Sequence, residues 1–324
     1  MTASAPAKLV LSGEYAVLYG APAIVLAVDR EVTVRIRERD DSRYVLHAPG
    51  VAATPEPFAV VAGEPRFDSS AATQRFALVS AVIRALGLPP SGADIEIDSR
   101  QLHADGRKLG LGSSAAVCVA LSRALAEWCP RIITLATVHE IHRASQSGRG
   151  SGVDLAAAWH GGLLRTERAG DDLAVTSLPA PQTSLRMIDT GVAQSTPAML
   201  TQLERWAEQA AEANAVIDAL CESARDAASA WQDGDGIAAT HGYLQALERF
   251  DQATGLGIVS PAHRHIAAIA ERVGVAYKPS GAGGGDVGVA LAADAAHVNA
   301  LDAALVSAGL AKSAPIQPCA PRAS

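Results

Sequence analysis

Apolar and polar positions alternate through much of the first half of the chain, which predicts strands separated by a few helices. Val32, Val34 and Ile36 occupy every second position, as in a strand with one buried face. Elsewhere in this half, apolar residues recur at intervals of three and four, as on one face of a helix. The predicted strands are 8–11, 23–28, 31–37, 44–47, 95–97, 162–166, 173–178 and 184–189, and the predicted helices are 74–86, 114–128, 134–147 and 153–159.

The second half has a different pattern, with long amphipathic stretches after a segment rich in Gly, Thr, Ser and Pro at 189–197. This segment is the predicted junction between two domains, 1–189 and 190–324. The predicted elements beyond it are helices 197–231, 237–253, 261–272 and 295–308, strands 275–277 and 287–291, and a short strand near Ile316. From Pro318 onward we expect a disordered tail. The mixture of strands and helices predicts an α+β fold.

Composition narrows the class of protein. The 324 residues are 49% hydrophobic and 19% charged, as in a globular chain of about two domains. The net charge of −7 argues against broad binding to nucleic acids or anionic membranes, which depends on Lys and Arg. Every apolar run is shorter than a membrane span, the N-terminus lacks a signal-peptide pattern, and the four Cys form no CxxC pair. We therefore expect a cytoplasmic protein with reduced thiols and no membrane partner.

Positive charge is carried by 23 Arg and only four Lys, namely Lys8, Lys108, Lys278 and Lys312. The first three lie in or beside glycine-rich segments. An ammonium is a compact point charge, whereas a guanidinium is a rigid planar fork. This placement predicts that these three lysines meet phosphate groups.

One glycine-rich segment, Gly110-Leu-Gly-Ser-Ser-Ala-Ala116, directly precedes a helical pattern. Its two glycines permit a tight backbone path, and Ser113 or Ser114 is a suitable N-cap. Free N–H groups at a helix N-terminus bind anions, so phosphate is the expected ligand. The structural alternative is a capped helix after a turn. The two glycines and Ala115 also fit a dinucleotide pattern, although a polar turn stands where that motif needs a buried strand, and the chain has no P-loop sequence.

Two further segments are candidates for chemistry. Segment 278–286 holds more glycine than a hairpin needs, which indicates close approach of its backbone to a phosphate or substrate. Segment 148–154 places Asp154 at the start of a helix, where it is either a first-turn cap or a catalytic carboxylate. Upstream, His139 and His142 lack an evident third ligand and are interpreted as surface or packing side chains.

An N-terminal segment, 6–18, adds Lys8 on a predicted strand followed by Gly-Glu-Tyr15-Ala-Val-Leu. Together and in this order, the four segments resemble the motifs of the GHMP small-molecule kinase superfamily, named after galactokinase, homoserine kinase, mevalonate kinase and phosphomevalonate kinase. Tyr15 and Asp286 are similar to the phosphomevalonate kinase pattern, whereas mevalonate kinases usually carry His and Gly there. The resemblance implies an N-terminal ribosomal-S5-like α+β domain, a C-terminal ferredoxin-like domain and a site between them.

The resemblance also implies roles for individual residues. Lys8 and Asp154 would be catalytic, and Ser114 would be a ligand of Mg²⁺. The residues implied to bind ATP are Lys108, Gly110, Leu111, Gly112, Ser113, Ser114 and Ala115. Those implied to bind the acceptor are Tyr15, Arg149, Ser151, Ser280, Gly281, Ala282, Gly283 and Asp286. Arg143 stands where mevalonate kinases carry a metal-binding Glu, and Glu140 is the nearest upstream carboxylate.

The expected reaction is phosphoryl transfer from ATP to 5-phosphomevalonate, with Mg²⁺. Its main obstacle would be repulsion between two phosphates, so positive side chains should surround the cleft. The candidates are Lys8, Lys108, Arg143, Arg149 and Lys278. Asp154 would then mainly orient Lys8 and the acceptor. The alternatives are a hydroxyl acceptor such as mevalonate, a regulatory protein that binds nucleotide without turnover, and a dinucleotide oxidoreductase; a homodimer is left open.

Overall fold

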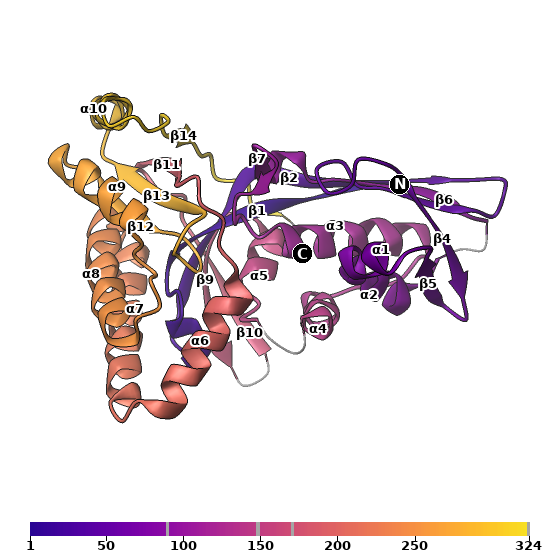
Figure 1. Cartoon of the computed structure of the whole chain (residues 1–324), viewed down its shortest axis with the longest axis horizontal. Helices are drawn as coiled ribbons and strands as arrows, with labels where there is room; N and C mark the ends of the chain where they lie inside the picture. Colours follow the sequence, from indigo (N-terminus) through magenta and orange to yellow (C-terminus); the bar gives the residue numbers. More distant parts are fainter. Residues whose placement is uncertain (89–90, 147–149, 170–171, 323–324) are drawn as a thin grey trace.

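The computed structural model describes residues 1–88, 91–146, 150–169 and 172–322, which form two large β-sheets with helices packed against them and a small two-stranded sheet (Figure 1). The larger sheet has the strand order β10-β9-β2-β6-β3-β4-β5, with β1 paired to β2. Its strands are β1 (Thr2–Ser12), β2 (Ala23–Glu38), β3 (Tyr44–His47), β4 (Glu56–Val61), β5 (Glu64–Phe67), β6 (Ala93–Asp98), β9 (Leu163–Ala169) and β10 (Asp172–Leu178). The α+β class is confirmed.

Strand pairing excludes the dinucleotide-binding alternative. Among the strands of the described ranges, every pairing is antiparallel except that of β3 with β6. A dinucleotide fold needs a parallel sheet built from βαβ units. The glycine segment instead follows a short hairpin of β7 (His103–Ala104) and β8 (Arg107–Lys108).

The first sheet carries its helices on one face (Figure 1). They are α1 (Ser70–Arg75), α2 (Ala77–Leu86), α3 (Ser113–Trp128), α4 (Leu135–Ser145) and α5 (Val153–His160). The 3₁₀ helices η1 (Ala16–Tyr19) and η2 (Arg100–Leu102) lie in the connections. α3 packs on β1 and β2 and buries Ala116, Val119, Ala120 and Leu121 completely. The N-terminus of α3 is thereby fixed beside β1.

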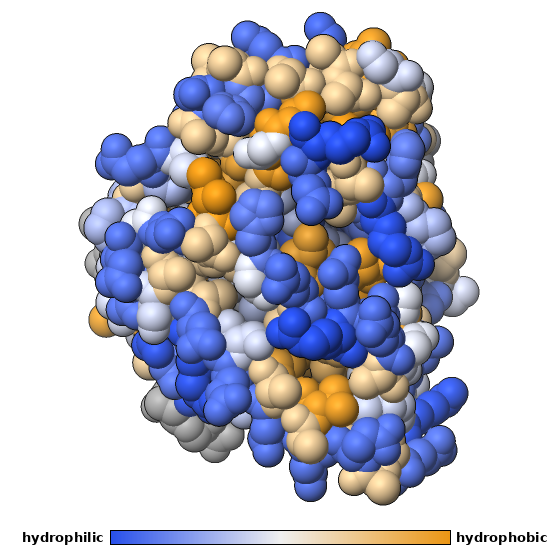
Figure 2. All heavy atoms as spheres, turned by 90° about the vertical axis from the view of Figure 1, so that its left-hand side faces the viewer, coloured by the Kyte–Doolittle hydropathy of each residue, from blue (hydrophilic) through white to orange (hydrophobic). Residues whose placement is uncertain are grey.

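The second sheet has the strand order β12-β13-β11-β14 and lies at one end of the elongated molecule (Figure 1). Its strands are β11 (Ser184–Asp189), β12 (Ala276–Pro279), β13 (Val287–Ala292) and β14 (Ala314–Pro315). The helices of this part are α6 (Thr196–Gln209), α7 (Ala213–Gln232), α8 (Gly236–Thr254), α9 (Pro261–Arg272) and α10 (Ala295–Ser307). Viewed from this end, hydrophilic side chains interrupt the apolar areas, as expected for amphipathic helices (Figure 2).

We call the part of the molecule built on the first sheet the first unit, and the part built on the second sheet the second unit. Two strand pairings near the ends of the second unit are not evident from the sequence ranges. β11 falls inside the predicted range 1–189 yet pairs with β13 and β14, and the ranges 1–189 and 190–324 stay a prediction. The disordered tail expected after Pro318 is wrong for the described residues. Pro318 pairs with Val28, and the Cys319 N–H donates to the carbonyl of Ala27 at 2.8 Å. The end of the chain therefore closes on the first sheet.

No helix in the described ranges is both long enough and apolar enough to cross a membrane.

Candidate active site

A cavity of about 1150 Å³ lies where the two units meet. Its wall is formed by β1 and η1, by the N-terminal turns of α3, α5 and α6, by α4, and by the loop between β12 and β13. Nearly all the site residues expected from the sequence line it, namely Lys8, Tyr15, Lys108, Gly110, Gly112, Ser113, Ser114, Ser151, Asp154, Ser280, Gly281, Ala282 and Asp286. Arg149 lies outside the described residues.

Three expected site residues are not in the wall of this cavity: Leu111, Ala115 and Gly283. Leu111 lies within the first glycine loop, which we call the phosphate loop (residues 109–114), and Ala115 follows it; both side chains are buried. The carbonyl of Leu111 accepts a hydrogen bond of 3.0 Å from the backbone N–H of Lys8. These side chains therefore support the loop and its attachment to β1.

The phosphate loop ends at an uncapped helix N-terminus. Gly110 and Gly112 have φ of 70° and 75°, a backbone region that favours glycine. Gly112 is the N-cap of α3, with no side-chain capping bond, so the expected cap at Ser113 or Ser114 is wrong. Both serines lie in the first turn and line the cavity. Unpaired N–H groups, two hydroxyls and the positive end of the helix dipole give this turn the chemistry of an anion site.

Lys8 and Asp154 lie together at this turn. Lys8 Nζ is 3.4 Å from Asp154 Oδ1, and the lysine side chain is only 7% exposed whereas the aspartate side chain is 41% exposed. A Cβ added to Gly112 would lie 3.0 Å from Lys8 Cγ and 3.3 Å from Asp154 Oδ2. Within the part of the chain that the structure describes, Asp154 accepts no capping hydrogen bond in α5, whose N-cap is Gly152. The carboxylate is therefore available to the ammonium and to the cavity.

His142 and His139 belong to the cavity wall, which the interpretation as surface or packing residues missed. His142 is buried, and its Nε2 lies 3.0 Å from Ser114 Oγ and 3.1 Å from the amide nitrogen of Gln146. Burial lowers the pKa of His142, against an opposing effect of the Asp154 carboxylate. His139 and His142 are three residues apart, which places them on one face of α4. This spacing does not show which part of the molecule that face contacts.

His139 offers a second ring nitrogen. Its Nε2 is buried without a hydrogen-bond partner among the described residues, and a Cβ on Gly152 would lie 2.9 Å from it. Burial is the main cause that lowers the pKa of His139, and Arg143 acts in the same direction. A buried ring nitrogen beside the first turn of α5 is suited to a polar group of a ligand.

The second glycine loop (residues 280–286) contacts the phosphate loop. A Cβ added to Gly110 would lie 2.5 Å from Asp286 Oδ2, so only glycine allows this approach. The Asp286 carboxylate accepts a 3.2 Å hydrogen bond from the backbone N–H of Gln194. Burial raises its pKa, while that hydrogen bond and the charge of Lys8 lower it. The Tyr15 hydroxyl donates to the carbonyl of Ala282 in the same loop.

The expectation that Lys278 adds positive charge to the cleft is wrong. Its side chain is fully buried, is paired with Glu14, and is absent from the cavity wall. Lys108, by contrast, is exposed on β8 and lines the cavity.

The cavity wall offers oxygen ligands for a divalent cation, although few of them are carboxylates. Within the described ranges, no three His, Cys, Asp or Glu side chains cluster as a metal site. Glu140 is exposed on α4 and does not line the cavity. The Ser114 hydroxyl and the Asp154 carboxylate do line it. This donor set fits Mg²⁺, which commonly takes one or two protein oxygens and completes its shell with phosphates and water.

Comparisons with known proteins identify relatives of this chain. Residues 74–162 match the family model of the GHMP kinases N terminal domain. The phosphomevalonate kinase of Streptomyces sp. (strain CL190) is 33% identical, over 89% of this chain and 88% of its own. The mevalonate kinase of Archaeoglobus fulgidus is 29% identical, over 88% of this chain and 90% of its own.

The fold is shared with solved structures. The structure of Streptococcus pneumoniae phosphomevalonate kinase in complex with phosphomevalonate and AMPPNP superimposes with a TM-score of 0.76, at 19% identity. It covers 97% of this chain and 99% of that one, which confirms the two-domain architecture. Given this fold, the matched N-terminal domain and a relative at 33% identity over almost the whole chain, the protein belongs to the GHMP kinase family of phosphotransferases.

Proposed function

We propose that this kinase transfers the γ-phosphoryl group of ATP to 5-phosphomevalonate, giving 5-diphosphomevalonate and ADP. The observation that carries the proposal is the Lys8–Asp154 pair beside the uncapped N-terminus of α3, in the wall of one large cavity. The choice of acceptor is supported by the 33% identical relative, which is named a phosphomevalonate kinase. Tyr15 and Asp286, the two residues that resemble the phosphomevalonate kinase pattern, both line the cavity.

On the nucleotide side, the first turn of α3 would bind the phosphates of ATP through its backbone N–H groups and the hydroxyl of Ser113. Lys108, which is exposed and lines the cavity, would add a positive charge. Ser114, with Asp154 nearby, would hold Mg²⁺ together with phosphate oxygens. When bound there, the ion would supply charge neutralisation to the nucleotide phosphates.

On the acceptor side, the attacking atom would be a phosphate oxygen. It forms a bond to the γ-phosphorus while the bond between that phosphorus and the bridging oxygen breaks, and ADP leaves with the electron pair. A phosphate oxygen is already anionic at neutral pH, so no general base is needed. Lys8 would donate to the transferring group, and Asp154 would hold Lys8 in place at 3.4 Å.

A hydroxyl acceptor is the second candidate. The half-exposed Asp154 carboxylate faces the cavity and could accept the proton of an alcohol. Relatives named mevalonate kinase also match almost the whole chain.

An ADP-release assay separates these candidates. The full chain is incubated with ATP and Mg²⁺ and, in parallel, with 5-phosphomevalonate, mevalonate or homoserine, with a Lys8→Ala variant as the blank. We expect turnover with 5-phosphomevalonate and at most about one hundredth of that kcat/KM with either alcohol. Turnover with mevalonate alone would establish the second candidate. Release of no ADP from any acceptor would favour a nucleotide-binding protein without turnover.

A further inference from the structure

The ammonium of Lys278 has no hydrogen left for a ligand. Lys278 lies at the end of β12 and is fully buried. Its Nζ donates to Glu14 Oε1, to the carbonyl of Pro279 at 2.5 Å and to the carbonyl of Val10 at 3.4 Å. An ammonium has three N–H donors, and three acceptors occupy them. This lysine therefore acts on protein groups and not on a phosphate.

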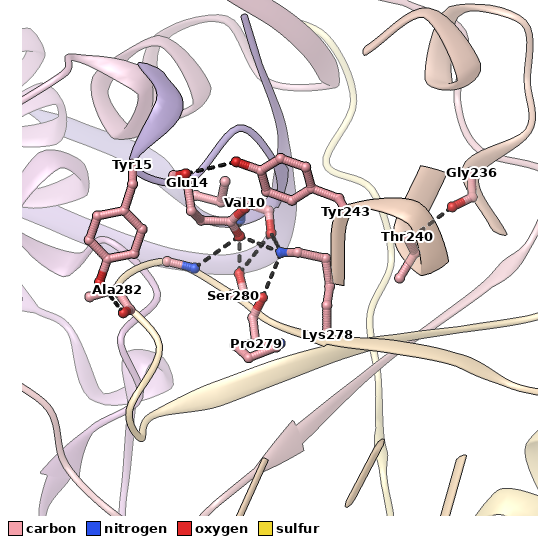
Figure 3. A network of polar contacts seen from close by, with 11 residues as sticks. Val10, Glu14, Tyr15, Gly236, Thr240, Tyr243, Lys278, Pro279, Ser280 and Ala282 are labelled. Carbon is pink, nitrogen blue, oxygen red and sulfur yellow. Dashed lines mark hydrogen bonds and ion pairs between the residues drawn. The ribbon is translucent and has the colours of Figure 1, made fainter. Parts of the chain in front are cut away.

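The same contacts join the two units of the molecule (Figure 3). Ser280 Oγ accepts from the backbone N–H of Val10 at 2.9 Å and donates to the carbonyl of Val10 at 3.0 Å. The Gly281 N–H donates to Glu14 Oε1 at 3.3 Å. From α8, the Tyr243 hydroxyl donates to the carbonyl of Glu14 at 2.8 Å. The start of the second glycine loop is thus tied to β1 and to the turn after it.

This attachment lies next to Lys8, which would contact the transferred phosphoryl group. A Cβ on Gly281 would lie only 3.6 Å from Lys8 Nζ, and Gly281 has φ of +83°. Lys8 and Val10 are on the same strand, β1. Any movement of the loop relative to β1 therefore changes the space around the Lys8 ammonium. A misplacement of about 1 Å at such a site can cost on the order of 100-fold in rate.

We propose that Lys278 is a positioning residue of the phosphoryl-transfer site: paired with Glu14, it fixes the second glycine loop against β1 so that Gly281 stays beside Lys8. A lysine suits this place because one small charged group contacts three acceptors that point at it from different segments. The planar fork of an arginine could not follow them. Only the kinetic part of the test of this inference rests on the proposed phosphoryl transfer.

The test uses four variants of the full chain. Lys278→Arg keeps the charge but not the shape. Lys278→Met and Glu14→Gln are combined in one double variant, because either single change would leave an unpaired buried charge that could unfold the protein. Lys312→Arg and Lys312→Met are the controls, since Lys312 is exposed and far along the chain from the network.

Two readouts are compared: steady-state kinetics with whichever acceptor releases ADP, and amide hydrogen exchange of residues 280–283 without substrate. For Lys278→Arg and for the double variant, we expect kcat to fall at least about tenfold, with KM for ATP within about twofold. Exchange at 280–283 should accelerate in both. The Lys312 variants should match the unmodified chain.

Two results would overturn the proposal. One is a folded double variant with unchanged kcat and unchanged exchange. The other is a fall in kcat without faster exchange, which would mean that Lys278 acts through its charge and not by holding the loop. The exchange result does not depend on the acceptor, so failure of 5-phosphomevalonate as a substrate would leave this part of the test intact.

Discussion

Lys8 and Lys278 are close in space but have different surroundings. Lys8 is paired with a half-exposed carboxylate at the edge of the cavity. Lys278 is enclosed, and burial lowers its pKa while the charge of Glu14 raises it. The Lys8 ammonium also lowers the pKa of Lys278, so the two positive charges repel. Glu14 offsets this repulsion by pairing with Lys278, and of the two lysines it is Lys8 that lines the cavity.

The role of Asp154 can be tested by Asp154→Asn. The amide keeps an oxygen toward Lys8 Nζ but cannot take a proton. If Asp154 only orients Lys8, kcat should fall about tenfold and the shape of the pH–rate profile should not change. Profiles of kcat and kcat/KM between about pH 6 and pH 9 provide the measurement. Complete loss of turnover, in an enzyme whose unmodified profile shows one essential base, would instead identify Asp154 as that base.

Among the elements, α3 has an N-terminus that depends on a glycine. Gly112→Ala places a methyl group 3.0 Å from Lys8 Cγ, in a residue with φ of +75°. Gly309→Ala is the matched control, because it has the same φ and nothing within 4 Å of the added carbon. Both variants should lose about 1–2 kcal/mol of unfolding free energy from backbone strain.

Only Gly112→Ala should lose activity, by about 100-fold in kcat/KM for ATP. Denaturant unfolding and steady-state kinetics on both variants provide the comparison. Equal kinetics in the two variants would show that the approach of Lys8 and Asp154 to Gly112 does not matter for turnover.

The elements also show what local sequence patterns could predict. β3, β11 and α9 have the predicted bounds, since each is a short, clearly bounded run. β2, predicted as two strands, is continuous. Its exposed Asp29 interrupts the apolar pattern and lies, with Arg30, at a register shift, but antiparallel pairing of residues 24–28 and 31–35 with β1 on either side keeps the strand continuous. Such pairing is a tertiary effect that local propensity does not contain.

The sequence pattern also did not predict one break between helices. The predicted helix 197–231 is divided between α6 and α7 at residues 210–212, where no Gly or Pro marks the break.

Within the site, the glycine segments, Lys8 and Asp154 could be placed from sequence because their motifs are local. Lys278 could not, because its partner Glu14 is 264 positions away.

At the scale of the whole molecule, the second glycine loop is held from both sides. On the cavity side it contacts Gly110 through Asp286, and at its start it is tied to β1. The loop is also contacted by His263 of α9, which is completely buried and does not line the cavity. Its Nε2 is 2.9 Å from the carbonyl of Gly285 and its Nδ1 is 2.7 Å from the hydroxyl of Tyr277. A neutral imidazole that donates from Nε2 and accepts at Nδ1 satisfies both contacts.

This buried imidazole should make the stability of the fold depend on pH. Burial lowers the pKa of His263 to about 4, while the hydrogen bond to Gly285 acts in the opposite direction. An unfolded chain has a histidine pKa near about 6.5, so between these values the unfolded state binds a proton that the folded state does not. The unfolding free energy should therefore fall as pH drops from about 6.5 to 4, by at most about 3 kcal/mol from this residue.

Denaturant unfolding of the unmodified chain and of His263→Gln, at several pH values from about 7.5 to 4.5, isolates this contribution. His139, His142 and His160 also have a pKa lowered by burial, so the unmodified chain shows their sum. Glutamine can still donate to Gly285 but does not titrate, and His263→Gln should flatten the pH dependence even where it lowers stability at neutral pH. The control is His265→Gln, exposed on the same helix. If His263→Gln and His265→Gln gave the same slope against pH, the buried imidazole of His263 would not be a source of the pH dependence.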